Sequence, residues 1–256
     1  RVEESIGGLL EVDGVVYALR ARGRLYALDA ERGDVLWRRE LRKLFGGELQ
    51  SWGHSTSPLV VADLLIVQAG GDAGKAIAAL HRATGEVAWT SFSDQAGYSS
   101  PILVTAAGVE QVVCLTAQHL VSVAPENGTV LWQVPFEGAI NIANPVQVSM
   151  DRIFVSAAYD KGAALVKVIG TQDGLTAAQE WTSRGMKNWI NSSVVLGDYL
   201  YGFDSSMLKC IAVDTGEMQW RQRGFGRGSL ILADGHLLVL GEDGALAVVE
   251  ATPLEY

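Results

Sequence analysis

Aromatic, amide and charged side chains recur just before short apolar segments of this sequence. The residues that could act together are Trp52, His54, Tyr98, Asn141, Asn188, Trp189, Asn191 and Arg227, with Phe225 close to the last. Rings, amides, an imidazole and a guanidinium that meet at one opening could form a pocket with a flat wall and a few polar anchors, which is suited to binding a small ligand. The alternative interpretation is structural: the amides bind nearby backbone and the rings cover the core.

Other catalytic patterns are absent from the sequence. The four histidines show no metal-ligand spacing, and His81, His119 and His236 flank expected turns, where a surface position is common. Neither a Gly-Lys-Ser/Thr phosphate loop nor a Gly-x-Ser-x-Gly elbow occurs. Cys114 and Cys210 lie in separate apolar segments, so we expect two buried thiols. We therefore predict no catalytic residue and no metal ligand.

The composition bears on the partners of the protein. The 29 acidic and 20 basic residues give a net charge of −9, whereas nucleic-acid binding needs a concentrated basic surface. No segment approaches the roughly 18 consecutive apolar residues of a transmembrane helix. With 256 residues, 48% of them apolar, the chain can bury a large core. No signal peptide is visible, but Arg1 is not a natural first residue, so we expect that residues before it were removed by processing or truncation.

The elements that would position the candidate residues form an internal repeat. Its clearest marker is a glycine followed four residues later by a tryptophan, as in 27–37. The pairs are Gly33/Trp37, Gly85/Trp89, Gly128/Trp132 and Gly216/Trp220, and a degenerate copy ends at Trp181, with Gly174 too far upstream. Glycine adopts positive φ at low cost and reverses the chain, and an indole can fill the wedge between two sheets. We therefore predict that these tryptophans join successive sheets.

A second marker, a Ser/Asn-rich step into an apolar strand, gives the length of the repeat. It occurs at 54–60, 98–104, 141–146, 191–195 and 227–231, with a worn copy at 5–10. Equivalent positions 8, 58, 101, 145, 194 and 230 are 50, 43, 44, 49 and 36 residues apart, which is the range of propeller blades. Within each unit, apolar segments alternate with turns that contain Gly, Asp or Asn, which predicts four strands. The segment 173–180 departs from this pattern, and we expect a loop there.

The predicted fold is an all-β propeller of four-stranded antiparallel blades, formed by residues 1–256 as a single domain. Six units are visible, starting near residues 5, 55, 98, 141, 191 and 227. In a propeller the first strand of each blade lines a central channel, and the loop before that strand lies at one mouth of the channel. The candidate residues are therefore expected to meet at one mouth, although they are far apart in the sequence.

The segment 27–37 resembles the tryptophan-docking motif of the pyrroloquinoline-quinone-like (PQQ-like) β-propeller repeats, and the resemblance covers the whole chain. That family includes quinone-dependent alcohol dehydrogenases and the propeller lipoprotein of the outer-membrane assembly machinery, so the resemblance indicates a fold rather than an activity. His81 and Ala212 stand where the motif has Asp, so we expect these blades, and the one ending at Trp181, to dock more loosely. The family usually has eight blades, which implies about two blades before Arg1. A six-bladed ring open at one seam is the alternative.

The resemblance also implies what an enzyme of this family would need. Its quinone dehydrogenases have an adjacent cysteine pair beside the cofactor and a Glu/Asn/Asp set that holds Ca²⁺. This sequence has no adjacent cysteines, and the carboxylates nearest to the candidate residues, Glu48 and Asp94, lie several residues upstream. We therefore expect a non-catalytic scaffold without a cofactor, which presents the loops 42–52 and 94–98 to a protein partner or larger complex.

The resemblance places such a protein in the periplasm or outside the cell. The alternative function is a PQQ-type quinone-binding oxidoreductase with Ca²⁺, similar to the alcohol dehydrogenases, or a binder of another small ligand at the channel mouth. A WD-repeat scaffold is a third class, but no unit contains the Gly-His and Trp-Asp pair of those repeats.

Overall fold

Within each sheet of the described part of the chain, strands that are consecutive in the sequence pair with one another, so the sheets are antiparallel meanders. The computed structural model describes residues 6–138 and 140–256, and their strands form five four-stranded sheets and one three-stranded sheet. The sheets belong to two compact units, residues 1–136 and 137–256. The predicted start of the first blade, at Ser5, lies outside the described residues.

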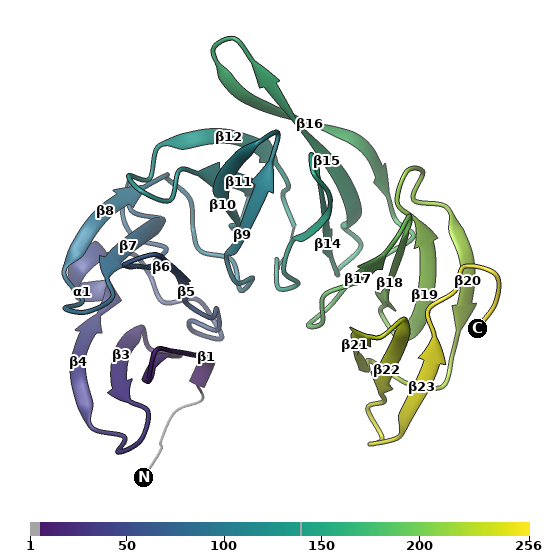
Figure 1. Cartoon of the computed structure of the whole chain (residues 1–256), viewed down its shortest axis with the longest axis horizontal. Coiled ribbons are helices and arrows are strands. Elements are labelled where there is room, and N and C mark those ends of the chain that lie inside the picture. The colour runs from purple at the N-terminus through teal and green to yellow at the C-terminus, as the bar shows by residue number, and fades with distance from the viewer. Residues whose placement is uncertain (1–5, 139) are drawn as a thin grey trace. The chain divides into compact units, whose positions relative to one another are not determined.

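The first unit contains three four-stranded sheets that follow one another along the chain (Figure 1). Its first sheet consists of β1 (Ile6–Val12), β2 (Val15–Arg20), β3 (Arg24–Asp29) and β4 (Val35–Glu40). The second consists of β5 (Leu59–Val61), β6 (Leu64–Gln68), β7 (Ile77–His81) and β8 (Val87–Ser91). The third consists of β9 (Ile102–Ala106), β10 (Val109–Leu115), β11 (His119–Val123) and β12 (Val130–Pro135). The short helix α1 (Leu41–Phe45) follows β4 and is the only helix in the described part of the chain.

The second unit contains the three remaining sheets. Its first sheet consists of β13 (Val146–Ser149), β14 (Arg152–Ala157), β15 (Gly162–Thr171) and β16 (Gly174–Ser183). The next consists of β17 (Val194–Leu196), β18 (Tyr199–Asp204), β19 (Met207–Ala212) and β20 (Met218–Gln222). The last has three strands, β21 (Ser229–Ala233), β22 (His236–Leu240) and β23 (Leu246–Glu250).

The hydrophobic core of each unit lies between consecutive sheets. One buried cluster joins the first and second sheets and includes Leu25 and Leu65. A second cluster joins the second and third sheets and includes Trp89 and Val121. In the second unit, corresponding clusters join its first sheet to the next and that sheet to the last. The first strands of successive sheets are also neighbours, as in β5 and β9, or β17 and β21. Within each unit, loops that precede these first strands are therefore brought near one another.

The recurring tryptophans bind the following sheet in four of the five cases. In each, the indole Nε1 donates a hydrogen bond to a backbone carbonyl just after the third strand of that sheet. The bonds run from Trp37 to Arg82 (2.9 Å), Trp89 to Pro125 (3.0 Å), Trp181 to Val213 (2.9 Å) and Trp220 to Thr252 (2.7 Å).

Three of the four glycines of the repeat, Gly85, Gly128 and Gly216, lie against these rings. A Cβ at Gly85 would be 2.8 Å from the Trp37 indole, and a Cβ at Gly128 would be 2.5 Å from the Trp89 indole. Both glycines have positive φ, +69° and +74°, as predicted for the turn. The repeat therefore uses glycine for two reasons: the turn needs its φ angle, and the ring of the preceding sheet needs the space.

The looser docking expected for three blades is not seen in their hydrogen bonds. Trp181 keeps its bond although the glycine spacing is lost, because strand register, not the glycine, places the ring. Trp181 pairs with Leu165 beside an irregularity in the ladder, just as Trp37 pairs with Ala27 beside one. Trp132 is the exception, since its Nε1 donates to the side chain of Gln111 in its own sheet.

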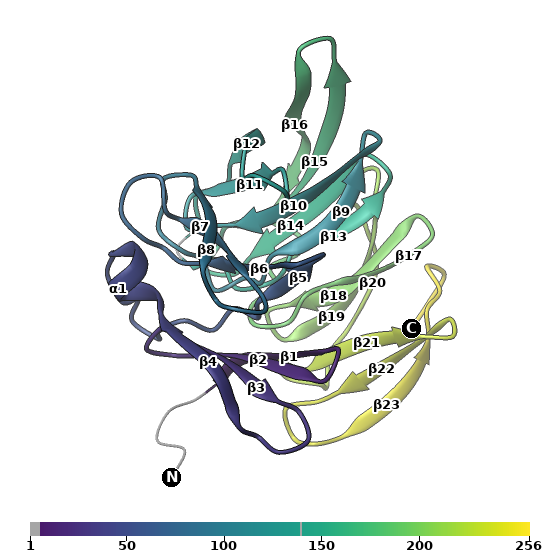
Figure 2. The same ribbon diagram turned by 60° about the vertical axis from the view of Figure 1, so that its left-hand side comes forward.

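The prediction of a loop at 173–180 was wrong, because most of this segment belongs to β16. The pairing of β15 with β16 continues to Thr171 and Gly174, whereas β14 pairs with β15 only as far as Lys167. The residues beyond form a two-stranded extension, which projects past β13 and β14 (Figure 2). Many of its residues are exposed, so the strand lacks the apolar pattern that identified the others.

Candidate functional site

The predicted candidate residues are divided between the two units. Those of the first unit are Trp52, His54 and Tyr98, and those of the second are Asn141, Asn188, Trp189, Asn191 and Arg227. Each unit brings some of its own candidates together, as described below. A common opening for all of them stays a prediction.

Trp52 and Tyr98, which come from loops before successive sheets, form an aromatic pair. Their ring centroids are 5.8 Å apart with planes at 65°, an edge-to-face arrangement. The backbone N–H of Trp52 donates to the Tyr98 hydroxyl oxygen at 3.4 Å. Trp52 is 64% exposed, whereas Tyr98 is partly buried. The pair therefore holds a large indole at the surface on a supporting ring.

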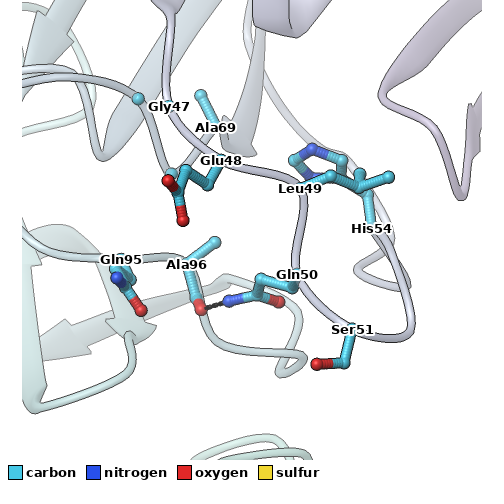
Figure 3. Close-up of a pocket in the computed structure, with 11 residues that line it drawn as sticks. Gly47, Glu48, Leu49, Gln50, Ser51, His54, Ala69, Gln95 and Ala96 are labelled. Carbon is cyan, nitrogen blue, oxygen red and sulfur yellow. Dashed lines mark hydrogen bonds between the residues drawn. The ribbon is translucent and has the colours of Figure 1, made fainter.

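A pocket of about 400 Å³ lies between the same two loops (Figure 3). We call it the loop pocket, and its lining residues are Gly47, Glu48, Leu49, Gln50, Ser51, His54, Ala69, Gly70, Gly71, Gln95 and Ala96. The Gln50 side-chain amide donates a hydrogen bond to the Ala96 carbonyl and so bridges the two loops. The volume is at the lower end of the about 300–1,000 Å³ range of small-ligand sites.

Close backbone packing forms one wall of the loop pocket. A Cβ at Gly47 would lie 2.2 Å from the carbonyl oxygen of Gly70, so no larger residue fits there. The N–H of Gly47 donates to Asp72 Oδ1 at 3.2 Å. These contacts fix the chain on the N-terminal side of Glu48 and thus position this carboxylate at the pocket.

His54 lines the pocket but is largely buried, with 8% of its surface exposed. Its ring packs against Gly23, where an added Cβ would be 3.1 Å from Nε2. Burial, followed by the positive charge of Arg42, lowers the pKa of His54 below its ordinary value. The imidazole is therefore neutral at pH 7 and adds no positive charge to the pocket.

A buried carboxylate anchors the loop that carries Gln95 and Ala96. Asp94 Oδ2 accepts hydrogen bonds from the Thr116 hydroxyl at 2.6 Å and from the backbone N–H of Gln118 at 3.0 Å. The same oxygen lies 3.0 Å from Nδ1 of His119. Asp94, one of the two nearest upstream carboxylates in the sequence, therefore anchors this loop to the β10–β11 hairpin and is not among the lining residues of the pocket.

Glu48, Gln50 and Gln95 are pocket residues that the sequence did not single out as site candidates. Glu48 was noted only as a carboxylate upstream of the predicted mouth. The available signal was the glycine pairs at 46–47 and 70–71, because paired glycines in loops permit a close approach of two backbones.

In the second unit, Trp189 and Arg227 are brought into contact. The Arg227 guanidinium lies 3.7 Å from the centroid of the Trp189 ring, a cation–π contact. The Trp189 indole N–H donates to the Tyr159 hydroxyl at 3.2 Å. Phe225, the neighbour of Arg227, instead packs on Tyr256 with ring centroids 6.2 Å apart. One face of the Trp189 ring is thus covered by a cation.

The asparagines among the candidates are used in structural contacts. The Asn188 amide donates to the Phe203 carbonyl at 3.1 Å, and the Asn191 amide donates to the Gly228 carbonyl at 2.7 Å. Asn141 is 2% exposed. The contacts of Asn188 and Asn191 match the structural interpretation, in which the amides bind nearby backbone.

The expected absence of a quinone cofactor stays a prediction. No group of three or more His, Cys, Asp or Glu side chains in residues 6–138 and 140–256 could hold a metal ion. Cys114 and Cys210 are free and buried, as predicted, and they lie in different units. No helix in the described part of the chain is long and apolar enough to cross a membrane.

Comparison with known proteins identifies the repeat. The family described as outer membrane protein assembly factor BamB matches residues 3–222 of the chain. The crystal structure of BamB from Moraxella catarrhalis is similar over 98% of this chain and 75% of that one, with a TM-score of 0.72 and 18% identity. No curated protein matches the chain by sequence.

Two further solved structures are similar over nearly the whole chain. The computationally designed Ika8 protein is similar over 96% of this chain and 71% of the Ika8 chain, with a TM-score of 0.62 and 15% identity. Apo AztD from Citrobacter koseri is similar over 98% of this chain and 71% of the AztD chain, with a TM-score of 0.58 and 12% identity. At such identities the structures show the fold alone, and the predicted all-β propeller fold is confirmed.

Proposed function

The chain belongs to the family of outer membrane protein assembly factor BamB, and on this premise we propose that it is a propeller scaffold that binds a protein partner and catalyses no reaction. The binding surface is the loop pocket together with the aromatic pair. The loops 42–52 and 94–98 carry the pair, and they line the pocket together with His54 and residues 69–71. The family description refers to protein assembly, which supports a partner within a larger complex. We place the protein in the periplasm or outside the cell.

The exposed indole of Trp52 is the observation that carries this proposal. A tryptophan that is 64% exposed forgoes most of the free energy that burial of its ring would contribute. Tryptophan and tyrosine are enriched among the residues that dominate binding energy in protein interfaces. An indole supported by Tyr98 at the edge of a pocket therefore has the features of an anchor for a partner surface.

The two loops are also held in place before any partner binds. Gln68 is buried; its Oε1 accepts from the Gly97 N–H at 3.0 Å and its Nε2 donates to the Ser99 carbonyl at 2.7 Å. The bond from Gln50 to Ala96 then links the first loop to the second. Preorganised loops lose less conformational entropy on binding, which favours recognition by this surface.

Site-specific photocrosslinking in the native cell tests the proposed surface. A photoreactive phenylalanine at position 52 or 98 should yield one discrete crosslinked protein. The matched control is Met150, which is 74% exposed and lies in the second unit. The same products from position 150 as from 52, or none from 52 and 98, would reject the surface.

The captured partner then allows an affinity measurement. Trp52→Ala should weaken binding by about 2 kcal/mol, or roughly thirtyfold, because an anchor residue is removed. Met150→Ala, at a residue 74% exposed in the second unit, should leave the affinity unchanged. Both variants should keep the melting temperature of the wild type, since both side chains are largely in solvent.

A thermal-shift measurement separates this function from quinone-dependent oxidation. Pyrroloquinoline quinone with Ca²⁺ should leave the melting temperature unchanged. A rise of several degrees that disappears in Trp189→Ala would favour the oxidoreductase instead.

A further inference from the structure

The loop pocket carries one formal charge, and it is negative. Glu48 is its only acidic residue, and no lysine or arginine lines it. The Glu48 side chain is exposed, and its carboxylate has no hydrogen-bond or ion-pair partner within residues 6–138 and 140–256. Figure 3 shows this carboxylate directed toward the loop that holds Gln95 and Ala96. The pocket thus presents an unused acceptor.

The other polar groups of the lining do not offset this charge. His54 is neutral, and Arg42, which acts on it, is not among the lining residues. Gln95 and Ser51 can each accept a hydrogen bond through an amide or hydroxyl oxygen. Asp72, whose Oδ1 accepts a hydrogen bond from the Gly47 N–H, is likewise not among the lining residues. The chain as a whole has a net charge of −9.

We infer that the loop pocket receives the cationic end of a lysine or arginine side chain from the protein partner. This inference rests on the proposed function. A guanidinium offers five donors and an ammonium three, and both match a carboxylate flanked by amide and hydroxyl oxygens. A bare metal ion fits less well, because Ca²⁺ needs six or more oxygen ligands, mostly from carboxylates and carbonyls. The exposed ring of Trp52 beside the pocket then contacts the surroundings of the basic residue.

The test uses small probes, so it does not require the partner. The ¹⁵N-labelled protein is titrated with Nα-acetyl-lysine amide, Nα-acetyl-arginine amide and the uncharged Nα-acetyl-norleucine amide. The cationic probes should shift the amide resonances of residues 47–51 and 95–96 in a saturable way, and norleucine amide should bind at least about tenfold more weakly. Salt at 0.5 M should weaken the cationic probes, since the carboxylate is exposed and screened.

Two matched variants assign the effect to one carboxylate. Glu48→Gln should weaken the cationic probes about tenfold, because a charge-assisted hydrogen bond becomes a neutral one. Glu110→Gln makes the same charge change at an exposed residue of β10 and should leave the affinity unchanged. Equal binding of norleucine amide, or an unchanged affinity in Glu48→Gln, would overturn the inference.

The two proposals can fail separately. If a partner is crosslinked at position 52 but Glu48→Gln does not change probe binding, the binding surface is supported and the cation pocket is rejected. Saturable, Glu48-dependent probe binding without any crosslinked partner would retain the pocket chemistry and reject the scaffold function.

Discussion

The indole Nε1 of Trp132 donates its hydrogen bond to Oε1 of Gln111, 2.6 Å away in the same sheet. The equivalent indoles reach carbonyls of the following sheet instead. Gln111 also accepts from the Ser122 hydroxyl at 2.7 Å and donates through Nε2 to the Ala106 carbonyl at 3.0 Å. One fully buried amide therefore satisfies the polar groups of three neighbouring strands.

Gln111→Leu should lower the free energy of unfolding by about 2–4 kcal/mol, because the Trp132 indole and the Ser122 hydroxyl would lose their acceptor inside the core. Urea unfolding followed by tryptophan fluorescence measures this loss. Gln219→Leu is the control, since Gln219 is exposed on β20 and should change stability little. Equal losses in the two variants would show that the buried amide is dispensable.

Gly85→Ala and Gly33→Ala separate the two uses of glycine in the repeat. Both residues have similar positive φ, +69° and +72°, so each alanine should cost about 1 kcal/mol of backbone strain. Only at Gly85 would the added Cβ meet an indole, whereas nothing lies within 4 Å of it at Gly33. Gly85→Ala should therefore lose about 1–3 kcal/mol more in urea unfolding. The packing explanation fails if the two losses agree.

His54 should make the stability of the protein depend on pH in the acidic range. Burial lowers the folded-state pKa below the unfolded value of about 6.5, so folding favours the neutral ring. Its contribution is present above about pH 6.5 and is lost as the pH falls through the folded-state pKa. The free energy of unfolding at pH 7 minus that at pH 5 should be smaller in His54→Gln. His236→Gln, at an exposed residue, should match the wild type, and an unchanged difference in His54→Gln would contradict the assignment.

The two thiols should be unreactive in the folded protein. Burial raises the pKa of Cys114 to about 12 and that of Cys210 to about 11, so little thiolate forms at pH 8.5. Iodoacetamide labelling, followed by mass spectrometry, should be absent without urea and complete in unfolding concentrations. The same shifts favour the folded state below the ordinary pKa of about 8.5, and this stability is lost as the pH rises toward 11–12. Rapid labelling of either cysteine at pH 8.5 without urea would refute the burial.

The propeller fold could be predicted because the same glycine–tryptophan spacing recurs several times in the sequence. The spacing from Gly33 to Trp37 recurs, and each copy combines a turn with a ring that needs a place between sheets. One copy of this motif would not have identified the fold, but few folds contain the motif repeatedly at such a spacing. The prediction failed at β16, where the glycine spacing is lost and many side chains are polar.

The candidate site was less predictable, because it depends on backbone contacts between distant segments. Trp52 and Tyr98 were named from their place before apolar strands, and they do form a pair. The approach of Gly47 to Gly70, which makes the pocket wall, has no periodic signal. The role of Gln111 could not be predicted either, because a glutamine in a strand gives no indication that it accepts a hydrogen bond from an indole.

The two-stranded extension of β15 and β16 should be the part of the first sheet of the second unit that unfolds most easily. Beyond Lys167 the ladder loses β14 as a third strand, and an isolated pair of strands is only marginally stable in water. Its backbone amides should therefore exchange hydrogen for deuterium far sooner than those of β14. A protease should first cut the second unit near Asp173, at the exposed turn that ends the extension, while the sheet below it stays folded.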